Sequence, residues 1–187
     1  RSHATLLDGN TFEPIYRLPT RFALHGGPKW SDGGRYIYFA SRDGWISKFD
    51  VFNLKYTAEV RAGINTRNLA VSHDGRYILV ANYLPHTLVI LDAAALNPLK
   101  VIPVKRGKDQ SSRVSAVYTA DPRESFVAAL KDIPEVWEIS YAEEPSAGQG
   151  WNHDHSAETI DSQFSQRFPI RRIEVSGFLD DFFLTQG

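Results

Sequence analysis

The chain of 187 residues contains no cysteine and no methionine. Without cysteine there can be no disulfide, thiolate metal site, iron–sulfur cluster or covalently attached c-type haem within this chain. An excess of charge of one sign is also lacking, because 21 basic residues are balanced by 22 acidic ones. The net charge of -1 gives no broad positive surface, so we expect neither nucleic acid nor an anionic membrane as a partner.

Long hydrophobic runs are missing as well. No apolar run approaches the roughly 20 residues that cross a bilayer, so no membrane span is predicted. The N-terminal RSHATLLDG has no charged-then-apolar leader, and we expect the chain to be a piece of a longer protein. What is present is 42% hydrophobic and 12% aromatic residues. That is enough apolar side chain to predict a globular fold with a core of ordinary domain size.

An internal repeat with an offset of about 41 residues organises the chain. Residues 31–60 align with residues 72–102, and GRY of the first segment falls on GRY of the second. Each repeat has a DG turn, a β-branched and aromatic run, a polar turn and a second run that ends in aspartate (ISKFD, LVILD). A third and a fourth short run follow. Four strands in about 40 residues are typical of a β-propeller blade.

The repeats fall near residues 31–71, 72–112 and 113–141, the third being degraded. Residues 142–167 are polar and are predicted to form a long surface loop, and residues 168–187 are predicted to begin the next blade. The stretch before residue 20 looks like the last two strands of a preceding blade. We therefore predict an all-β fold, a partial β-propeller with about four blade-equivalents of a larger ring.

His25 lies in FALHGGPKW, at the entrance to a blade. Entrance loops of a propeller converge on one face. A neutral imidazole there, followed by two glycines that let the backbone approach a flat ligand, is suited to axial ligation of a haem iron. The alternative is an ordinary turn in which the histidine is solvated or caps a strand. The residues alone favour the turn.

Three arginines occupy loop positions between predicted strands, namely Arg42 in SRDG, Arg67 in INTRN and Arg113 in SSRVS. The planar guanidinium binds carboxylates through two parallel hydrogen bonds, so arginines that point into one concavity suit a ligand with several carboxylates. The alternative is a surface ion pair with a nearby acid such as Asp43. The sequence leaves these two interpretations evenly balanced.

Aromatic residues and histidines near strand ends are further candidates. Tyr83, Trp45 and Trp137 are placed where they could flank a macrocycle, although packing between blades is the favoured interpretation for the two tryptophans. His153 and His155 in NHDH lie two positions apart, but without a third ligand they are predicted to belong to a solvated loop. GxSxG, P-loop and GxGxxG motifs are absent from the sequence.

The segment FALHGGPKWSDGGRYIYFASRDGWISKFD resembles the haem d1-binding propellers, the family of cytochrome cd1 nitrite reductase and its relatives in haem d1 biosynthesis. The resemblance implies an eight-bladed propeller and makes His25 the proximal axial ligand of the haem iron. It also implies that Arg42 and Arg67 contact the carboxylates of haem d1 and that Tyr83 lies at the rim of the pocket.

The sequence departs from the reductase at two positions. Where the reductases carry two distal histidines that protonate nitrite, the similar stretches LKDIPEVWEI and SGFLDDFFL offer Lys131 and Asp180. An ordinary lysine or aspartate does not titrate near neutral pH, so nitrite reduction is not expected. Lys131 and Asp180 remain candidate catalytic groups for another reaction.

Four sequence motifs are most similar to the branch of the family that acts last in haem d1 biosynthesis, namely HGGPKW, AGINTRN, ANYLPHTLV and FPIRRIE. This resemblance implies a periplasmic oxidoreductase that desaturates a propionate of dihydro-haem d1, with a c-type haem in an N-terminal domain outside this chain. It implies a c-type cytochrome as electron acceptor and nitrite reductase as a further partner. Alternatives are a non-catalytic haem d1 carrier or assembly scaffold, a nitrite reductase-type propeller, and a propeller used only for protein contacts.

Overall fold

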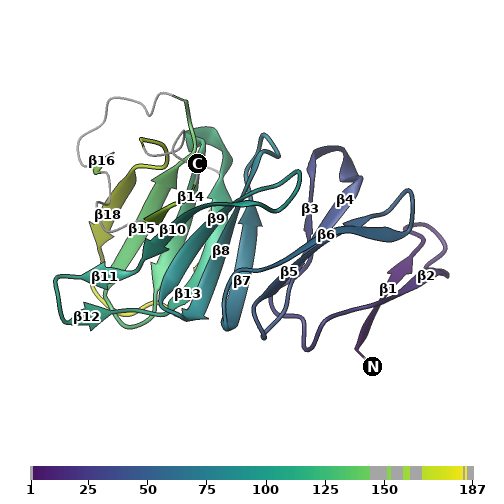
Figure 1. Ribbon diagram of the computed structural model, residues 1–187, viewed down its shortest axis with the longest axis horizontal. Helices are drawn as coiled ribbons and strands as arrows, with labels where there is room; N and C mark the ends of the chain where they lie inside the picture. The colour runs from purple at the N-terminus through teal and green to yellow at the C-terminus, as the bar shows by residue number, and fades with distance from the viewer. Residues whose placement is uncertain (1, 144–150, 153–157, 161–165, 183, 185–187) are drawn as a thin grey trace.

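The chain folds into antiparallel β-sheets that stand side by side, with almost no helix (Figure 1). The computed structural model describes residues 2–143, 151–152, 158–160, 166–182 and 184. Within these residues the helical elements are two short 3-10 turns, η1 (Asp32–Gly34) and η2 (Asp121–Arg123). None of the helical elements in this part of the chain is long and apolar enough to cross a membrane.

The first blade is a four-stranded sheet in the order β3-β4-β5-β6. Its strands are β3 (Lys29–Trp30), β4 (Tyr36–Ala40), β5 (Trp45–Asp50) and β6 (Lys55–Arg61). A hairpin of β1 (His3–Leu7) and β2 (Pro14–Pro19) precedes it. Leu18 of this hairpin packs with Phe39 and Phe49 of the first blade, so the hairpin covers one face of that sheet.

The second blade has the order β17-β10-β9-β8-β7. Its strands are β7 (Asn65–Val71), β8 (Tyr77–Leu84), β9 (Thr87–Asp92), β10 (Pro98–Pro103) and β17 (Glu158–Thr159). Four strands follow one another along the chain, and β17 comes from much later in the sequence to pair with the outer strand β10. A strand of two residues therefore covers part of an edge that would otherwise present unpaired backbone groups.

The third blade has the order β13-β14-β15-β18-β16. Its strands are β13 (Val114–Ala120), β14 (Ser125–Leu130), β15 (Glu135–Ser140), β18 (Ile170–Glu174) and β16 (Trp151–Asn152). A small hairpin of β11 (Lys105–Arg106) and β12 (Gln110–Ser111) joins it to the second blade. The first strands of neighbouring blades lie against one another, β3 against β7 and β13 against β7.

The prediction of an all-β chain is confirmed, while the sheets differ from the predicted four strands, because among the described residues only the first blade has four and the second and third have five. Two further local predictions are corrected. FPIRRIE was predicted to begin the next blade, but β18 pairs with β15 and is the fourth strand of the third blade. Residues 142–167 were predicted to be a loop, but β16 and β17 lie within them. Both differences have one cause, because an insertion separates β15 from its antiparallel partner β18. Strands that pair across such an insertion leave no local pattern in the sequence.

The two GRY repeats adopt the same turn. The backbone oxygens of Ser31 and Ser72 each accept a hydrogen bond from the amide of the glycine three residues later. Their hydroxyl oxygens each accept a hydrogen bond from the amide of the tyrosine five residues later. Gly34 and Gly75 both have φ of 69°, a left-handed conformation that glycine adopts without a Cβ clash. The repeat read from the sequence is therefore a repeat of hydrogen bonds.

Apolar residues fill the spaces between neighbouring blades. Leu69, Ile78 and Val80 of the second blade are fully buried and pack with Tyr38 and Ile46 of the first. Trp137 is fully buried in the cluster shared by the second and third blades, as predicted for packing between blades. Trp45 is half-buried, with the guanidinium of Arg21 4.2 Å from its ring centroid.

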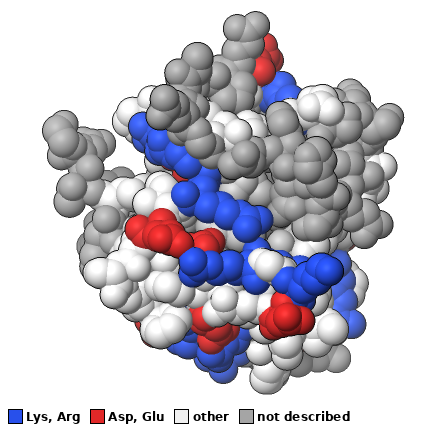
Figure 2. Space-filling model, turned by 90° about the vertical axis from the view of Figure 1, so that its left-hand side faces the viewer, with Lys and Arg blue, Asp and Glu red and all other residues white. Residues whose placement is uncertain are grey.

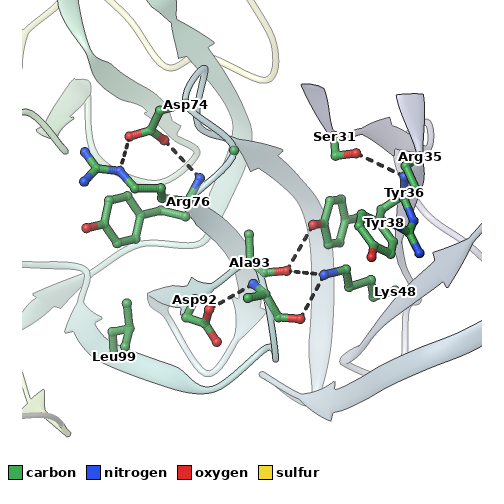
Figure 3. Close-up of a pocket in the computed structure, with 13 residues that line it drawn as sticks. Ser31, Arg35, Tyr36, Tyr38, Lys48, Asp74, Arg76, Asp92, Ala93 and Leu99 are labelled. Carbon is green, nitrogen blue, oxygen red and sulfur yellow. Dashed lines mark hydrogen bonds and ion pairs between the residues drawn. The ribbon is translucent and has the colours of Figure 1, made fainter. Parts of the chain in front are cut away.

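Polar bonds also join the first blade to the second (Figure 3). The ammonium of Lys48, a residue that is only 6% exposed, donates to the carbonyl oxygens of Ala93 at 2.9 Å and Ala94 at 2.8 Å. The hydroxyl of Tyr38 donates to the same Ala93 oxygen at 3.0 Å. These groups border a cavity of about 630 Å³ that also has Tyr36 in its wall. Its residues lie near the DG turns of the two repeats.

Basic side chains gather on the outer side of the third blade, with acidic side chains among them (Figure 2). Buried Glu138 accepts from Arg123 at 2.6 Å and from Arg171. Arg106 contacts Glu174 at 2.6 Å and the buried Glu135 at 3.4 Å. A buried carboxylate needs such a partner, so these arginines neutralise acids of the third blade.

Candidate functional site

The predicted site residues gather where β4, β8 and β14 end and where β7 and β13 begin. The chain at His25 is fixed by a bond from its backbone amide to the carbonyl of Ala40, the last residue of β4. Arg67 lies in β7 and Tyr83 in β8, while Arg113 directly precedes β13 and Lys131 directly follows β14. Antiparallel neighbours reverse direction at each turn, so these positions share one end of the blades.

Arg67 contacts both ring nitrogens of His25. Nδ1 of His25 lies 2.6 Å from the backbone oxygen of Arg67. A carbonyl oxygen only accepts, so Nδ1 carries the proton and donates it to this oxygen. Nε2 then holds a lone pair, and it accepts a hydrogen bond from Nη1 of Arg67 at 2.7 Å. The tautomer of the imidazole is thereby fixed by its surroundings.

The pKa of His25 is held below its ordinary value of 6.5. Burial is the largest cause, because it disfavours the imidazolium, and the positive charges of Arg67 and Arg42 act in the same direction. The bond to the Arg67 carbonyl partly opposes them. His25 is therefore a neutral imidazole at neutral pH.

The ring of Tyr83 is surrounded by three cations. The guanidinium of Arg113 lies 5.4 Å from its centroid, that of Arg67 5.7 Å and the ammonium of Lys131 6.0 Å. Each distance is within the range in which a cation is attracted by an aromatic face. Tyr83 thus holds together three positive charges that come from two blades.

The three predicted arginines differ in their partners. Arg113 is bound by Asp132 through two bonds of 2.9 and 2.5 Å, and this pairing lowers the pKa of Asp132 to about 2. Arg67 donates Nε to the carbonyl of Ser115 at 3.3 Å. Arg42 is exposed, and its side chain forms no hydrogen bond or ion pair with any other described residue. The proposed alternative partner, Asp43, instead accepts from the hydroxyl of Ser41 at 2.5 Å.

Lys131 and Asp180 are brought together as an ion pair. The carboxylate of Asp180 raises the pKa of Lys131, and the ammonium lowers the pKa of Asp180. The segment that carries Asp180 is also held by β13, because the hydroxyl of Ser115 donates to the carbonyl of Leu179 at 2.8 Å. Both groups are therefore charged at neutral pH.

Several features of the site were not identified from the sequence. Asp132 and Ser115 bind the predicted arginines, and exposed apolar side chains flank the site, namely Phe22, Ile64 and Leu84, which are 68%, 63% and 50% exposed. Ile64 and Leu84 lie in AGINTRN and ANYLPHT, beside the predicted site residues Arg67 and Tyr83. An apolar residue next to these motifs was the signal in the sequence that could have indicated an exposed apolar flank. His153 and His155 lie outside the described residues.

The residues present fit an iron that a macrocycle already holds. Groups of three or more histidine, cysteine, aspartate or glutamate side chains able to hold a free metal ion are absent from the described part of the chain. His25 offers one neutral imidazole nitrogen, which is what an axial position requires. The arginines around it supply donors for carboxylates at the edge of such a ligand.

Comparisons with known proteins identify the family of the chain. Residues 1–168 match the family model described as "Cytochrome D1 heme domain". The "Dihydro-heme d1 dehydrogenase" of Pseudomonas aeruginosa is 64% identical over 140 residues, which cover 75% of this chain and 28% of that protein. The solved structure of "Dihydro-heme d1 dehydrogenase NirN in complex with DHE" has a TM-score of 0.81 at 54% identity and covers 98% of this chain and 35% of its own.

A more distant structure bears on the fold alone. The β-propeller domain of Cps50 (Swd1) from Myceliophteria thermophila has a TM-score of 0.60 at 17% identity, covering 86% of this chain and 50% of that one. The chain spans about a third or less of the length of the two dehydrogenase relatives. The blades described above are therefore part of a β-propeller, and the chain belongs to the cytochrome d1 haem domain family.

Proposed function

We propose that this chain forms part of the tetrapyrrole site of a periplasmic oxidoreductase that desaturates a propionate of dihydro-haem d1, the last step of haem d1 biosynthesis. The observation that carries the proposal is the neutral imidazole of His25, fixed in one tautomer and set among arginines. The 64% identity to a dihydro-heme d1 dehydrogenase supports it.

Each predicted residue has a role in holding the substrate. His25 supplies the axial nitrogen for the iron, since its Nδ1 is already occupied by the Arg67 carbonyl. Arg42, Arg67 and Arg113 bind the carboxylates. Arg42 can do so without breaking a hydrogen bond or ion pair to another described residue. Tyr83 keeps Arg67, Arg113 and Lys131 at one rim.

The reaction removes two electrons and two protons from a saturated side chain and leaves the double bond of an acrylate. A c-type haem in a domain outside this chain would supply the means of accepting these electrons, with a c-type cytochrome as the further acceptor. Lys131 and Asp180 are the candidate groups for the proton transfers. Their ion pair places both pKa values far from neutral, which makes either one a weak acid or base for that task.

That last observation favours a second candidate, a haem d1 carrier or assembly scaffold that binds the tetrapyrrole without converting it. Such a protein needs His25 and the arginines but no base. A nitrite reductase-type propeller is less supported, because a lysine and an aspartate lie where nitrite protonation calls for groups that titrate near neutral pH.

Binding is tested by an absorption titration of haem d1 into the chain. We expect a low-spin shift in the wild type that is lost in His25→Ala. His73→Ala is the matched control, because His73 lies after β7 at the opposite end of the blades and its side chain is 72% exposed. Equal spectra for wild type and His25→Ala would reject tetrapyrrole ligation by this histidine.

Conversion is tested with the full-length protein and dihydro-haem d1. Formation of haem d1 with reduction of an added c-type cytochrome is the result expected of the dehydrogenase. Tight, His25-dependent binding without conversion would identify the carrier. Co-purification with nitrite reductase would test the further partner proposed for either protein.

A further inference from the structure

A single residue satisfies both nitrogens of the His25 imidazole. The backbone oxygen of Arg67 accepts from Nδ1 at 2.6 Å, and Nη1 of the same arginine donates to Nε2 at 2.7 Å. Nε2 is the nitrogen that an axial ligand presents to iron. In this structure the guanidinium of Arg67 therefore occupies the lone pair that the proposed function requires.

The partners of Arg67 are unusual for a guanidinium. Arg113 is bound by the carboxylate of Asp132, whereas the side chain of Arg67 donates to a neutral imidazole nitrogen and to the carbonyl of Ser115 at 3.3 Å. Asp180 is near enough for its pKa to be lowered by Arg67, but its ion pair is with Lys131. Bonds between two ionised groups are stronger than bonds to a neutral acceptor, so a carboxylate brought to this rim competes well for Arg67.

The two bonds to His25 differ in how easily they break. The Nδ1 bond is made to the backbone of β7, which is paired with β8 on both sides of this position. The Nε2 bond is made by a long side chain that can rotate. When the side chain of Arg67 leaves, the imidazole keeps its tautomer and its orientation.

We propose that Arg67 is a carboxylate-operated gate, which caps Nε2 of His25 until a carboxylate of the incoming tetrapyrrole draws the guanidinium away. The inference rests on the proposed function and adds selectivity to it. A tetrapyrrole without a carboxylate at that edge has to break the Arg67–His25 bond, and no new bond to Arg67 compensates for the loss. Ligation of the iron is thus coupled to recognition of a side chain of the macrocycle.

The cap is tested without any tetrapyrrole. Diethyl pyrocarbonate modifies a neutral imidazole through a free lone pair, and the rate at His25 is followed by mass spectrometry of the peptide that contains it. We expect Arg67→Met, which keeps an apolar side chain of similar length, to accelerate modification of His25 at least about fivefold. Arg17→Met is the matched control, because Arg17 is exposed in β2 and its side chain contacts His3, and this change should leave that rate unchanged. Equal rates in wild type and Arg67→Met would overturn the cap.

The gate itself is tested by titrating haem d1 and its fully methyl-esterified form into the same proteins. The wild type should bind the free acid at least about tenfold more tightly than the ester. Arg67→Met should bind the ester more tightly than the wild type does, because the cap is gone, whereas Arg42→Ala should not. An arginine that only contacts carboxylates would leave affinity for the ester unchanged, and that result overturns the gate.

The two proposals fail in different ways. A spectrum that never depends on His25, with either ligand, rejects the proposed function and the gate together. A His25-dependent shift with equal wild-type affinities for acid and ester rejects the gate and the carboxylate contacts of the arginines, while ligation of the iron by His25 stands. This second comparison uses only the wild type, so it remains decisive even where Arg67→Met does not fold.

Discussion

Lys131 and Asp180 form an ion pair that ties the end of β14 to the segment following β18. The two residues are separated by 49 positions and come together at the rim that Tyr83 also shares. The lysine side chain is 30% exposed and the aspartate 68%. The pair therefore closes one side of the candidate site without being buried in it.

Replacing Asp180 by Asn should lower the pKa of Lys131 toward its ordinary value of 10.5, since the bond to this carboxylate is the largest cause of the increase. The contribution of the pair to stability should be present above the pKa of an unfolded aspartate and lost as the pH falls through the lowered pKa of Asp180. The measurement is an NMR titration of the lysine side chain. Asp181→Asn is the control, because Asp181 accepts from Tyr118. An unchanged pKa of Lys131 would show that the pair does not form in solution.

Acid should destabilise the chain partly through His25. Its pKa is lower in the folded chain than the ordinary 6.5, so the unfolded chain binds more protons between these two values. The sign follows directly: this contribution to the free energy of unfolding is complete above about 6.5 and declines as the pH falls below it. Denaturant unfolding at several pH values between 5 and 8 should show a steeper decline for the wild type than for His25→Ala. Parallel curves for the two proteins would contradict the lowered pKa.

Lys48 should stabilise the junction of the first two blades. Lys48→Ala removes two charge-assisted bonds to Ala93 and Ala94, and a hydrogen bond to a charged group contributes about 1.5–3 kcal/mol. We expect a loss of about that size in the free energy of unfolding, because Ala93 keeps its bond from Tyr38 and Ala94 is exposed. Lys55→Ala, at an exposed position of β6, should change it by less than about 0.5 kcal/mol. Equal effects of the two changes would show that the junction does not depend on this lysine.

The repeat and its turns could be predicted from the sequence because their signals are local. Glycine at a left-handed position and a serine three residues before it encode the same turn at Ser31 and Ser72. The assignment of β18 to the third blade could not be predicted in this way, since its partner β15 lies beyond an insertion. Strand pairing over that distance depends on the whole sheet.

The candidate site shows the same division. His25, Arg42 and Arg67 were identified from a resemblance that includes their short motifs. The bonds between His25 and Arg67 could not be foreseen, because these residues are 42 positions apart and meet only when the first two blades pack together. The roles of His25, Arg42, Arg67, Tyr83 and Arg113 as ligand contacts remain predictions.

The two glycines after His25 should respond differently to alanine. Gly26 has φ of 69°, and a Cβ built there lies 2.2 Å from Oδ1 of Asn68 in β7. Gly26→Ala should therefore destabilise the chain by about 1 kcal/mol or more through the left-handed backbone alone, and it should displace His25.

Gly27 is the matched control, because a Cβ there has no heavy atom within 4 Å and its φ is not in the left-handed range. Gly27→Ala should keep the wild-type free energy of unfolding within about 0.5 kcal/mol. If the glycine pair lets a flat ligand approach the backbone, the same change should weaken haem d1 binding in the absorption titration. Loss of affinity in Gly27→Ala without loss of stability would place the ligand against this turn. Unchanged affinity would mean that the turn serves only to position His25.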